Sequence, residues 1–121
     1  QYKRIIGVEL SDLIYVARQN VDKMKHRRTR QIDLIQCDAQ DFTVPSEVNV
    51  IYFYSPFAGP LLEKVTANIY ASFRKTLRRI FIIYFNNDHF DRVINRQNWL
   101  TKIDQSSLHP HNSCGLYVTR P

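Results

Sequence analysis

The fold is decided by the stretch Val48-Asn49-Val50-Ile51-Tyr52-Phe53-Tyr54-Ser55-Pro56-Phe57. An almost unbroken run of β-branched and aromatic residues is typical of a strand buried on both faces, as in a parallel sheet flanked by helices. In open α/β sheets, ligands bind beyond the carboxyl ends of the strands. The polar, proline-containing tip of this strand, Ser55-Pro56-Phe57, is therefore a candidate site.

The elements around this strand predict an α/β fold. Further apolar strands are expected at Arg4–Leu10, Ile32–Cys37 and Ile80–Phe85. Apolar residues spaced three or four apart predict two amphipathic helices, with buried stripes at Ile14, Ala17, Val21 and Met24 and at Leu62, Val65, Ile69 and Phe73. The order strand, helix, strand, strand, helix, strand predicts a doubly wound, mostly parallel sheet.

The C-terminal part of the chain has a weaker pattern. A short helix is expected around Phe90 to Asn95. Strands are expected near Leu100 to Asp104 and from Gly115 to Thr119, with a polar turn between them. Two strands so close together predict an antiparallel hairpin at the edge of the sheet.

Length and composition limit the class of protein. The 121 residues, 44% hydrophobic and 23% charged, are typical of one globular domain spanning 1–121 rather than a disordered chain. No apolar run approaches the roughly 20 residues that span a bilayer, and no secretory leader is recognisable, so we expect a cytoplasmic protein without membrane partners. Cys37 and Cys114 lie far apart in the sequence, which favours two reduced thiols over a disulfide framework.

The positive charge leaves two interpretations open. The formal net charge is +6, and the segment from Lys23 to Arg30 contributes a cluster of cations. Such a cluster can bind the phosphates of nucleic acid. Cations at a helix C-terminus also complement the helix dipole and simply face water.

Two acids follow predicted strands. Glu9 ends the first strand, and Asp38 follows the second. An acid in this position can accept both hydroxyls of a ribose, which is why nucleotide-type ligands favour it. Surface acids at loop starts and helix caps are also common, so a purely structural role remains an alternative for each.

Three segments together resemble the class I S-adenosylmethionine-dependent methyltransferases. They are Gly7-Val8-Glu9-Leu10-Ser11, Cys37-Asp38-Ala39-Gln40-Asp41-Phe42 and Tyr54-Ser55-Pro56-Phe57. The resemblance covers nearly the whole chain, from the second strand of that Rossmann-like fold onward. It implies methyl transfer from S-adenosylmethionine to an acceptor that the sequence does not identify.

The resemblance also implies roles for individual residues. Glu9 would hold the ribose hydroxyls of the cofactor, and Leu10 would pack on the adenine. Asp38 would accept a hydrogen bond from the adenine amino group, and the backbone of Ala39 would meet the ring edge. Ser55-Pro56-Phe57 would lie where the methyl group meets the acceptor.

The strand tip is similar to a shortened form of a motif found in amino-directed methyltransferases. That motif reads Asp, Asn or Ser, then two prolines and an aromatic residue, and here one proline is missing. The alternative for Ser55-Pro56-Phe57 is a simple bend followed by a core phenylalanine.

One part of the family pattern is missing. In the family, the first strand and its glycine-rich loop hold the methionine half of the cofactor. This sequence has no counterpart of them, because it contains only three glycines and none forms a G-x-G pattern. The chain is therefore expected to be a C-terminal portion that lacks an N-terminal strand–helix unit and binds the cofactor weakly or not at all. Because that strand lies mid-sheet, its neighbours would have unpaired edges, through which the chain could also oligomerise. A non-enzymatic interaction module that contacts nucleic acid is the rival hypothesis.

Other groupings are interpreted as structural. His109, His111 and Cys114 lack the paired-cysteine spacing of zinc sites, so no metal site is predicted. His89 is expected to begin a helix rather than to act as an acid or base. Alternating aromatic residues on the strands are expected in the core, namely Tyr52, Tyr54, Phe81 and Phe85.

Overall fold

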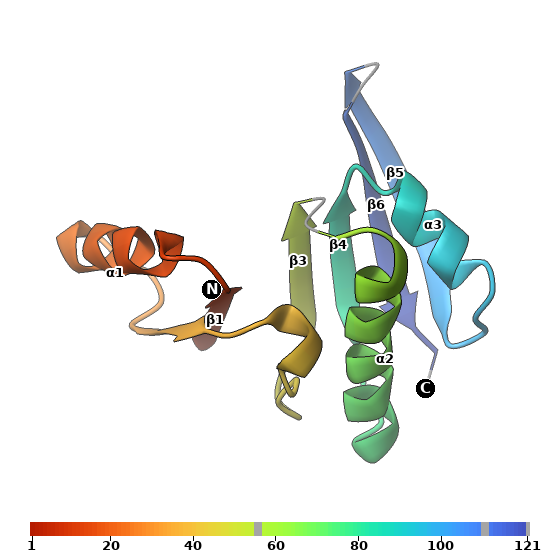
Figure 1. The fold of residues 1–121 in the computed structure, drawn as a ribbon, viewed down its shortest axis with the longest axis horizontal. Coiled ribbons are helices and arrows are strands. Elements are labelled where there is room, and N and C mark those ends of the chain that lie inside the picture. The colour runs from red at the N-terminus through yellow and green to blue at the C-terminus, as the bar shows by residue number, and fades with distance from the viewer. Residues whose placement is uncertain (55–56, 110–111, 121) are drawn as a thin grey trace. The chain divides into compact units, whose positions relative to one another are not determined.

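A computed structural model describes residues 1–54, 57–109 and 112–120. The chain divides into two compact units, residues 1–42 and 43–121 (Figure 1). Each unit is an α/β structure, as the sequence predicts. The interpretation of the whole chain as one partial domain stays a prediction.

The first unit is a parallel strand pair joined by a helix. Strand β1 (Arg4–Glu9) pairs with β2 (Gln31–Gln36), so that Glu9 lies opposite Gln36. Helix α1 (Leu13–Lys23) makes the crossover that parallel strands require. It buries Ile14 as predicted, but Met24 is exposed because the helix ends at Lys23 and the backbone turns extended there. The inclusion of Met24 in the buried stripe was therefore wrong.

The second unit contains a four-stranded mixed sheet. Its strands are β3 (Val50–Tyr54), β4 (Phe81–Phe85), β5 (Leu100–His109) and β6 (Asn112–Thr119), in the spatial order β3-β4-β6-β5. β3 and β4 are parallel, and β6 is antiparallel to both of its neighbours. The predicted C-terminal hairpin is thus confirmed, with both strands longer than their sequence pattern indicates.

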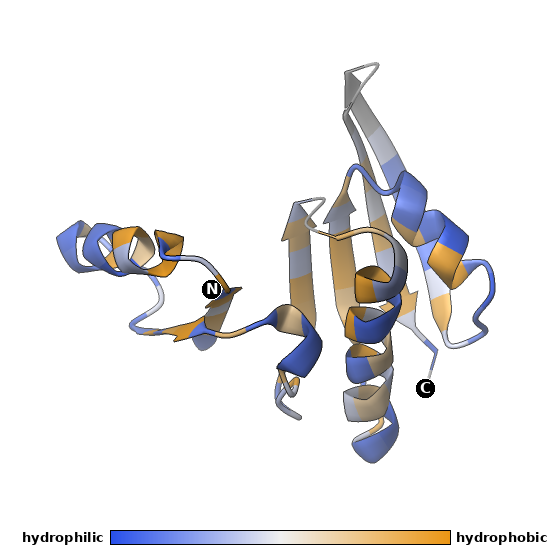
Figure 2. Cartoon of the chain, viewed as in Figure 1, coloured by the Kyte–Doolittle hydropathy of each residue, from blue (hydrophilic) through white to orange (hydrophobic). Residues whose placement is uncertain are grey.

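Two helices lie over one face of this sheet (Figure 1). Helix α2 (Gly59–Lys75) begins at Gly59, whose φ of 57° suits glycine, and Pro60 follows in its first turn. The predicted stripe is confirmed, because Leu62, Val65, Ile69 and Phe73 are all buried. Helix α3 (Asp88–Ile94) places Phe90 against the ring of Tyr84, with the ring centroids 4.7 Å apart. Figure 2 shows the hydrophobic character of β4, the strand at the centre of this packing.

The opposite face of the sheet is open, which contradicts one prediction. The side chains of Tyr52 and Tyr54 are 58% and 65% exposed, although the sequence predicts them in the core. They pack only sideways, against the ring of Phe85. Alternation along the strand correctly placed both side chains on one face, but no described element of the second unit covers that face.

Arg78 anchors the segment that leads into β3. Its guanidinium donates to the carbonyl oxygens of Val48 (2.7 Å) and Pro45 (3.2 Å), and also to the hydroxyl of Ser72 (2.8 Å). Arg78 lies beyond the end of α2 and ties that helix end to the segment that enters β3.

Replacing Arg78 with lysine is expected to lower the free energy of unfolding by about 1–2 kcal/mol, because an ammonium cannot reproduce the planar array of donors. Urea denaturation followed by circular dichroism measures this change. Arg79→Lys is the matched control, since Arg79 is exposed, and it should change stability by less than about 0.5 kcal/mol. Equal effects of the two substitutions would contradict the anchoring role.

Candidate functional site

One candidate site lies in the first unit, at the carboxyl edge of β1 and β2. The two strands are parallel and in register, so the residues that follow them meet at the same edge. The backbone N–H of Cys37 donates to the carbonyl oxygen of Glu9 at 3.1 Å and extends the pairing by one step. The amide of Gln36 donates to the carbonyl oxygen of Leu10 at 3.3 Å. The structure thus brings the loops that carry Glu9 and Asp38 together.

Glu9 is held in place by its own loop. Its Oε1 atom accepts hydrogen bonds from the backbone N–H of Ser11 (2.8 Å) and from the Ser11 hydroxyl (2.7 Å). These two bonds, the backbone one foremost, lower the pKa of the Glu9 carboxyl. Both are made to Oε1, and Oε2 accepts from neither group of Ser11. A fixed, ionised carboxylate of this kind is suited to accept a hydrogen bond from a hydroxyl group of a ligand.

Asp38 has a local structural role as well. It caps the short 3-10 helix η1 (Ala39–Asp41), accepting from the backbone N–H and the side-chain amide of Gln40, both at 3.0 Å. Asp38 therefore has the helix-capping role that the sequence left open as an alternative. Glu9 likewise stabilises its own loop. Neither role uses up the acceptor capacity of a carboxylate, which has about four lone-pair positions.

Leu10 is apolar and exposed beside these acids. Its side chain is 62% exposed, directly after Glu9, and Leu13 nearby is equally exposed. The sequence analysis singled out Leu10 but not Leu13. Together they provide apolar surface next to polar acceptors, which is the combination that a purine nucleoside needs.

Another candidate site lies in the second unit, at the carboxyl edge of β3 and β4. Ser55 and Pro56 lie outside the described residues, so only Phe57 of the predicted tip is placed. Its ring packs edge-on against Phe53 at 5.9 Å, and its carbonyl oxygen accepts from the Tyr84 hydroxyl at 3.3 Å. Burial raises the pKa of Tyr84, so this hydroxyl stays protonated as a donor. Phe57 is thus an anchored, half-buried residue, as in the core-phenylalanine alternative.

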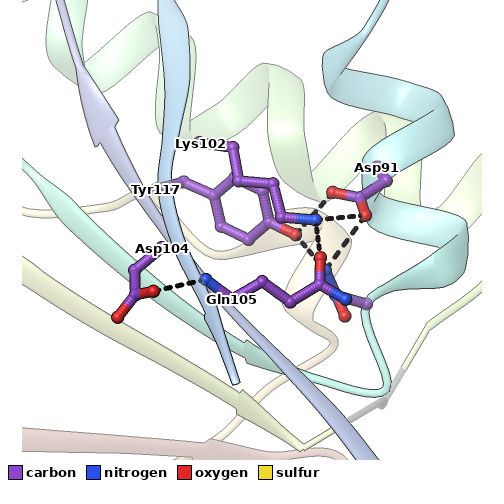
Figure 3. A network of polar contacts seen from close by, with 6 residues as sticks. Asp91, Lys102, Asp104, Gln105 and Tyr117 are labelled. Atoms are coloured by element: carbon purple, nitrogen blue, oxygen red, sulfur yellow. Dashed lines mark hydrogen bonds and ion pairs between the residues drawn. The ribbon is translucent and has the colours of Figure 1, made fainter. Parts of the chain in front are cut away.

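A polar network supports the turn that follows β4 (Figure 3). Asp91 accepts from the Tyr117 hydroxyl at 2.7 Å, from Lys102 at 2.7 Å and from the Asn87 amide at 3.1 Å. The Asn87 amide also donates to the Tyr117 hydroxyl at 2.5 Å. These contacts join α3 to β5 and β6, and they fix the chain just beyond the carboxyl end of β4.

Sequence analysis did not identify this network. Asp91 and Tyr117 lie 26 positions apart and share no motif. The one available signal was Tyr117 itself, which lies in a predicted strand. A tyrosine that is buried there needs a hydrogen-bond partner for its hydroxyl.

The alkaline stability of the second unit should depend on Tyr117. Burial, foremost, and the contact with Asp91 raise its pKa above the ordinary value. Its contribution is therefore complete below the unfolded-state pKa of about 10 and is lost as pH rises above that value, because the unfolded chain ionises first. Urea denaturation at pH 9 and pH 11 should show a smaller pH-dependent loss of stability for Tyr117→Phe than for the unaltered chain. An identical loss in both would contradict this assignment.

Other candidate groups do not form a site in the part of the chain that the structure describes. No three His, Cys, Asp or Glu side chains there come close enough to hold a metal ion. His111 lies outside that part, as does the side chain of His109, and Cys114 is half-buried with a free thiol. His89 is exposed in the first turn of α3, where the sequence placed it. None of the helices described is both long and apolar enough to cross a membrane.

The groups at the two strand edges are suited to binding and positioning a ligand. One presents carboxylates and apolar surface, and the other presents a strand tip and a fixed turn. Reactions that need a ligand held in a defined orientation fit this set of groups best.

Solved structures resemble this chain, whereas no protein-family model matches it and no curated protein matches its sequence. The N-methyltransferase NodS from Bradyrhizobium japonicum, solved with S-adenosyl-L-homocysteine, aligns with a TM-score of 0.65 and 12% identity over 98% of this chain and 67% of its own. Magnesium protoporphyrin IX methyltransferase from Synechocystis, solved with S-adenosylmethionine, aligns with a TM-score of 0.64 and 14% identity over 98% and 60%. The yhhF protein from Escherichia coli aligns with a TM-score of 0.69 and 12% identity over 98% and 66%.

These similarities establish the fold. The chain has the Rossmann-like fold of class I methyltransferases, as its sequence resemblance implied. It spans 60% to 67% of the length of these three structures.

Proposed function

We propose that this chain is the C-terminal part of an enzyme that transfers a methyl group from S-adenosylmethionine to an acceptor. The observation that carries the proposal is the pair of acids, Glu9 and Asp38, at one carboxyl edge of a parallel strand pair. Ligands of open α/β sheets bind at that edge. A methyltransferase fold and a nucleoside-type half-site therefore occur in the same chain.

The cofactor half of the proposed site uses four residues. Glu9 accepts from the ribose hydroxyls through Oε2, and its lowered pKa keeps it ionised for this purpose. Leu10 packs on the adenine, for which its exposed side chain is available. Asp38 accepts from the adenine amino group, and the backbone of Ala39, the first residue of η1, meets the ring edge.

The acceptor half of the proposed site is Ser55-Pro56-Phe57. Methyl transfer from a sulfonium is a direct displacement, so the protein contributes mainly proximity and an in-line orientation of donor and acceptor. Phe57 supports this function through the bond from Tyr84, which fixes the backbone just after the tip. In this proposal Ser55 and Pro56 contact the acceptor and determine which nucleophile approaches the methyl group.

Isothermal titration with S-adenosylmethionine tests the proposal. The protein expressed from its whole reading frame should bind the cofactor, and the 121-residue chain should bind at least ten times more weakly. Absence of binding by the longer protein would refute the methyltransferase assignment, whereas weak binding by the 121-residue chain agrees with it.

The basic loop between α1 and β2 favours a second candidate function, contact with nucleic acid. Lys25, His26, Arg27 and Arg28 are exposed there, and no acid pairs with them among the described residues. Fluorescence anisotropy with a 20-nucleotide single strand measures this binding, and its affinity should fall steeply with salt. Binding of the strand by a longer protein that does not bind the cofactor would replace the first proposal with this one.

A further inference from the structure

The amino edge of the β1–β2 pair carries a concentration of positive charge. The two strands begin in register at Arg4 and Gln31, and the helix that joins them ends at Lys23, on the way back to this edge. Arg4 is paired with Asp33, but the other cations here form no ion pair among the described residues. We call these exposed cations the basic end, and they are Lys3, Lys23, Lys25, Arg27, Arg28 and Arg30. They outnumber Asp22, the acid in the last turn of α1.

The acids of the first unit gather at the opposite edge. Glu9 ends β1, Asp12 caps α1, and Asp38 and Asp41 flank η1. Along β1 the two edges are roughly 17 Å apart, at about 3.3 Å per residue from Arg4 to Glu9. The Debye length at physiological ionic strength is only about 8 Å, so these acids do not cancel the field of the basic end. A polyanion is therefore attracted to the basic end, away from the acids assigned to the cofactor.

An exposed aromatic ring is held beside these cations. The side chain of Tyr2 is 55% exposed. The buried hydroxyl of Thr29 donates to the carbonyl oxygen of Tyr2 at 2.8 Å, and the side-chain amide of Gln1 donates to the carbonyl oxygen of Arg28. These bonds tie the segment before β1 to the basic loop, so that Tyr2 lies next to Arg28 and Arg30 rather than on a free end.

The combination of cations and an exposed ring determines which polyanion fits. Cations alone attract any phosphate-bearing surface, whether duplex, single strand or membrane. An aromatic ring adds a platform on which an unpaired base can stack, whereas the bases of a duplex are already stacked on one another. A single strand is therefore the ligand that uses both features.

We propose that the basic end binds single-stranded nucleic acid, with its cations on the phosphates and the ring of Tyr2 stacked on a base. The proposal rests on the second candidate function given above and adds the location and the manner of binding. Because the basic end and the acids at the carboxyl edge lie at opposite ends of the strands, contact with a strand and binding of a cofactor do not exclude each other.

Fluorescence anisotropy with a labelled 20-nucleotide oligothymidylate, on the protein expressed from its whole reading frame, tests the role of the cations. The double substitution Arg27→Gln and Arg28→Gln should weaken binding at low salt at least about tenfold. It should also reduce the slope of log affinity against log salt by about 1.4, because each phosphate contact on a single strand contributes about 0.7. Arg74→Gln with Lys75→Gln is the control, since it removes the same charge from the exposed end of α2, and it should change the affinity less than about twofold.

A second set of variants tests stacking. Tyr2→Ala should weaken binding at least about fivefold without changing the salt slope, because stacking releases no counterions. Tyr2→Phe keeps a flat ring and should stay within about twofold of the unaltered protein. Tyr15→Ala is the matched control, because Tyr15 is 52% exposed near the start of α1, at the far end of that helix from the basic loop. Circular dichroism shows that each variant is folded, and the bond from Thr29 to the backbone of Tyr2 is retained in all of them.

Several results would overturn the inference. They are an affinity that neither Tyr2→Ala nor the double arginine substitution changes, a duplex of the same length bound as tightly as the single strand, and equal salt slopes for the arginine variant and the unaltered protein. Cosedimentation with vesicles of three parts phosphatidylcholine to one part phosphatidylserine that depends on the two arginines, without any strand binding, would assign the surface to a membrane instead. Strand binding that survives all these substitutions would leave the second candidate function standing and remove only this surface from it, whereas absence of strand binding would remove both.

Discussion

Glu9→Ala is expected to weaken binding of S-adenosylmethionine to the longer protein about 10- to 100-fold. A hydrogen bond to a charged group contributes about 1.5–3 kcal/mol, which corresponds to this range of affinity. The Oε2 atom of Glu9 is available for such a bond, and its carboxyl is already ionised through the donors of Ser11. Isothermal titration at pH 7 gives the two dissociation constants.

Asp12→Ala is the matched control for this change. This substitution removes the same charge from the same loop as Glu9→Ala does. The side chain of Asp12 makes no capping hydrogen bond to α1. It should alter the affinity by less than about twofold if only the general potential near the site is affected. Circular dichroism of both variants shows whether the loop remains folded. An unchanged affinity of a folded Glu9→Ala protein would refute the assignment of Glu9 to the ribose.

Gly115→Ala is expected to destabilise the second unit by about 2–3 kcal/mol and to lower its melting temperature by about 10 °C or more. A Cβ atom at this position would lie 2.3 Å from the Tyr117 hydroxyl and 2.6 Å from the Asn87 amide nitrogen. Both atoms are held by hydrogen bonds to Asp91, so neither can move aside without breaking the polar network. Differential scanning calorimetry measures the change.

Gly7→Ala provides the comparison for this prediction. There the added Cβ would lie 2.8 Å from Cδ2 of Leu34, which is the far end of a flexible side chain and can rotate away. We expect a loss of less than about 1 kcal/mol. If the two substitutions cost the same, the rigidity of the Asn87–Tyr117–Asp91 network would not be the reason for glycine at position 115.

The sequence predicted most of the elements because local periodicity determines them. The α2 stripe from Leu62 to Phe73 and the apolar strand at Phe81–Phe85 follow directly from spacing and composition. The acids Glu9 and Asp38 were recognisable because each comes straight after a strand. Their convergence at one edge then follows from the parallel pairing of β1 and β2.

Contacts between distant positions could not be predicted from local patterns. Alternation on β3 showed that Tyr52 and Tyr54 share a face, but it could not show whether another element covers that face. No local pattern predicts the role of Arg78, because its bonds to Val48 and Pro45 depend on a loop about 30 positions away. The same holds for Asp91 and Tyr117, which belong to different elements.

The position of β6 has a consequence for the synthesis of this protein. Although β6 is the last strand in the chain, it lies between β4 and β5 inside the sheet. Chains emerge from the ribosome N-terminus first, so β4 and β5 are made before the strand that lies between them. The second unit therefore cannot complete its sheet until β6 has been made. Loss of the segment that forms β6 would leave β4 and β5 without their shared neighbour, so the sheet of the second unit depends on the strand that is made last among its four.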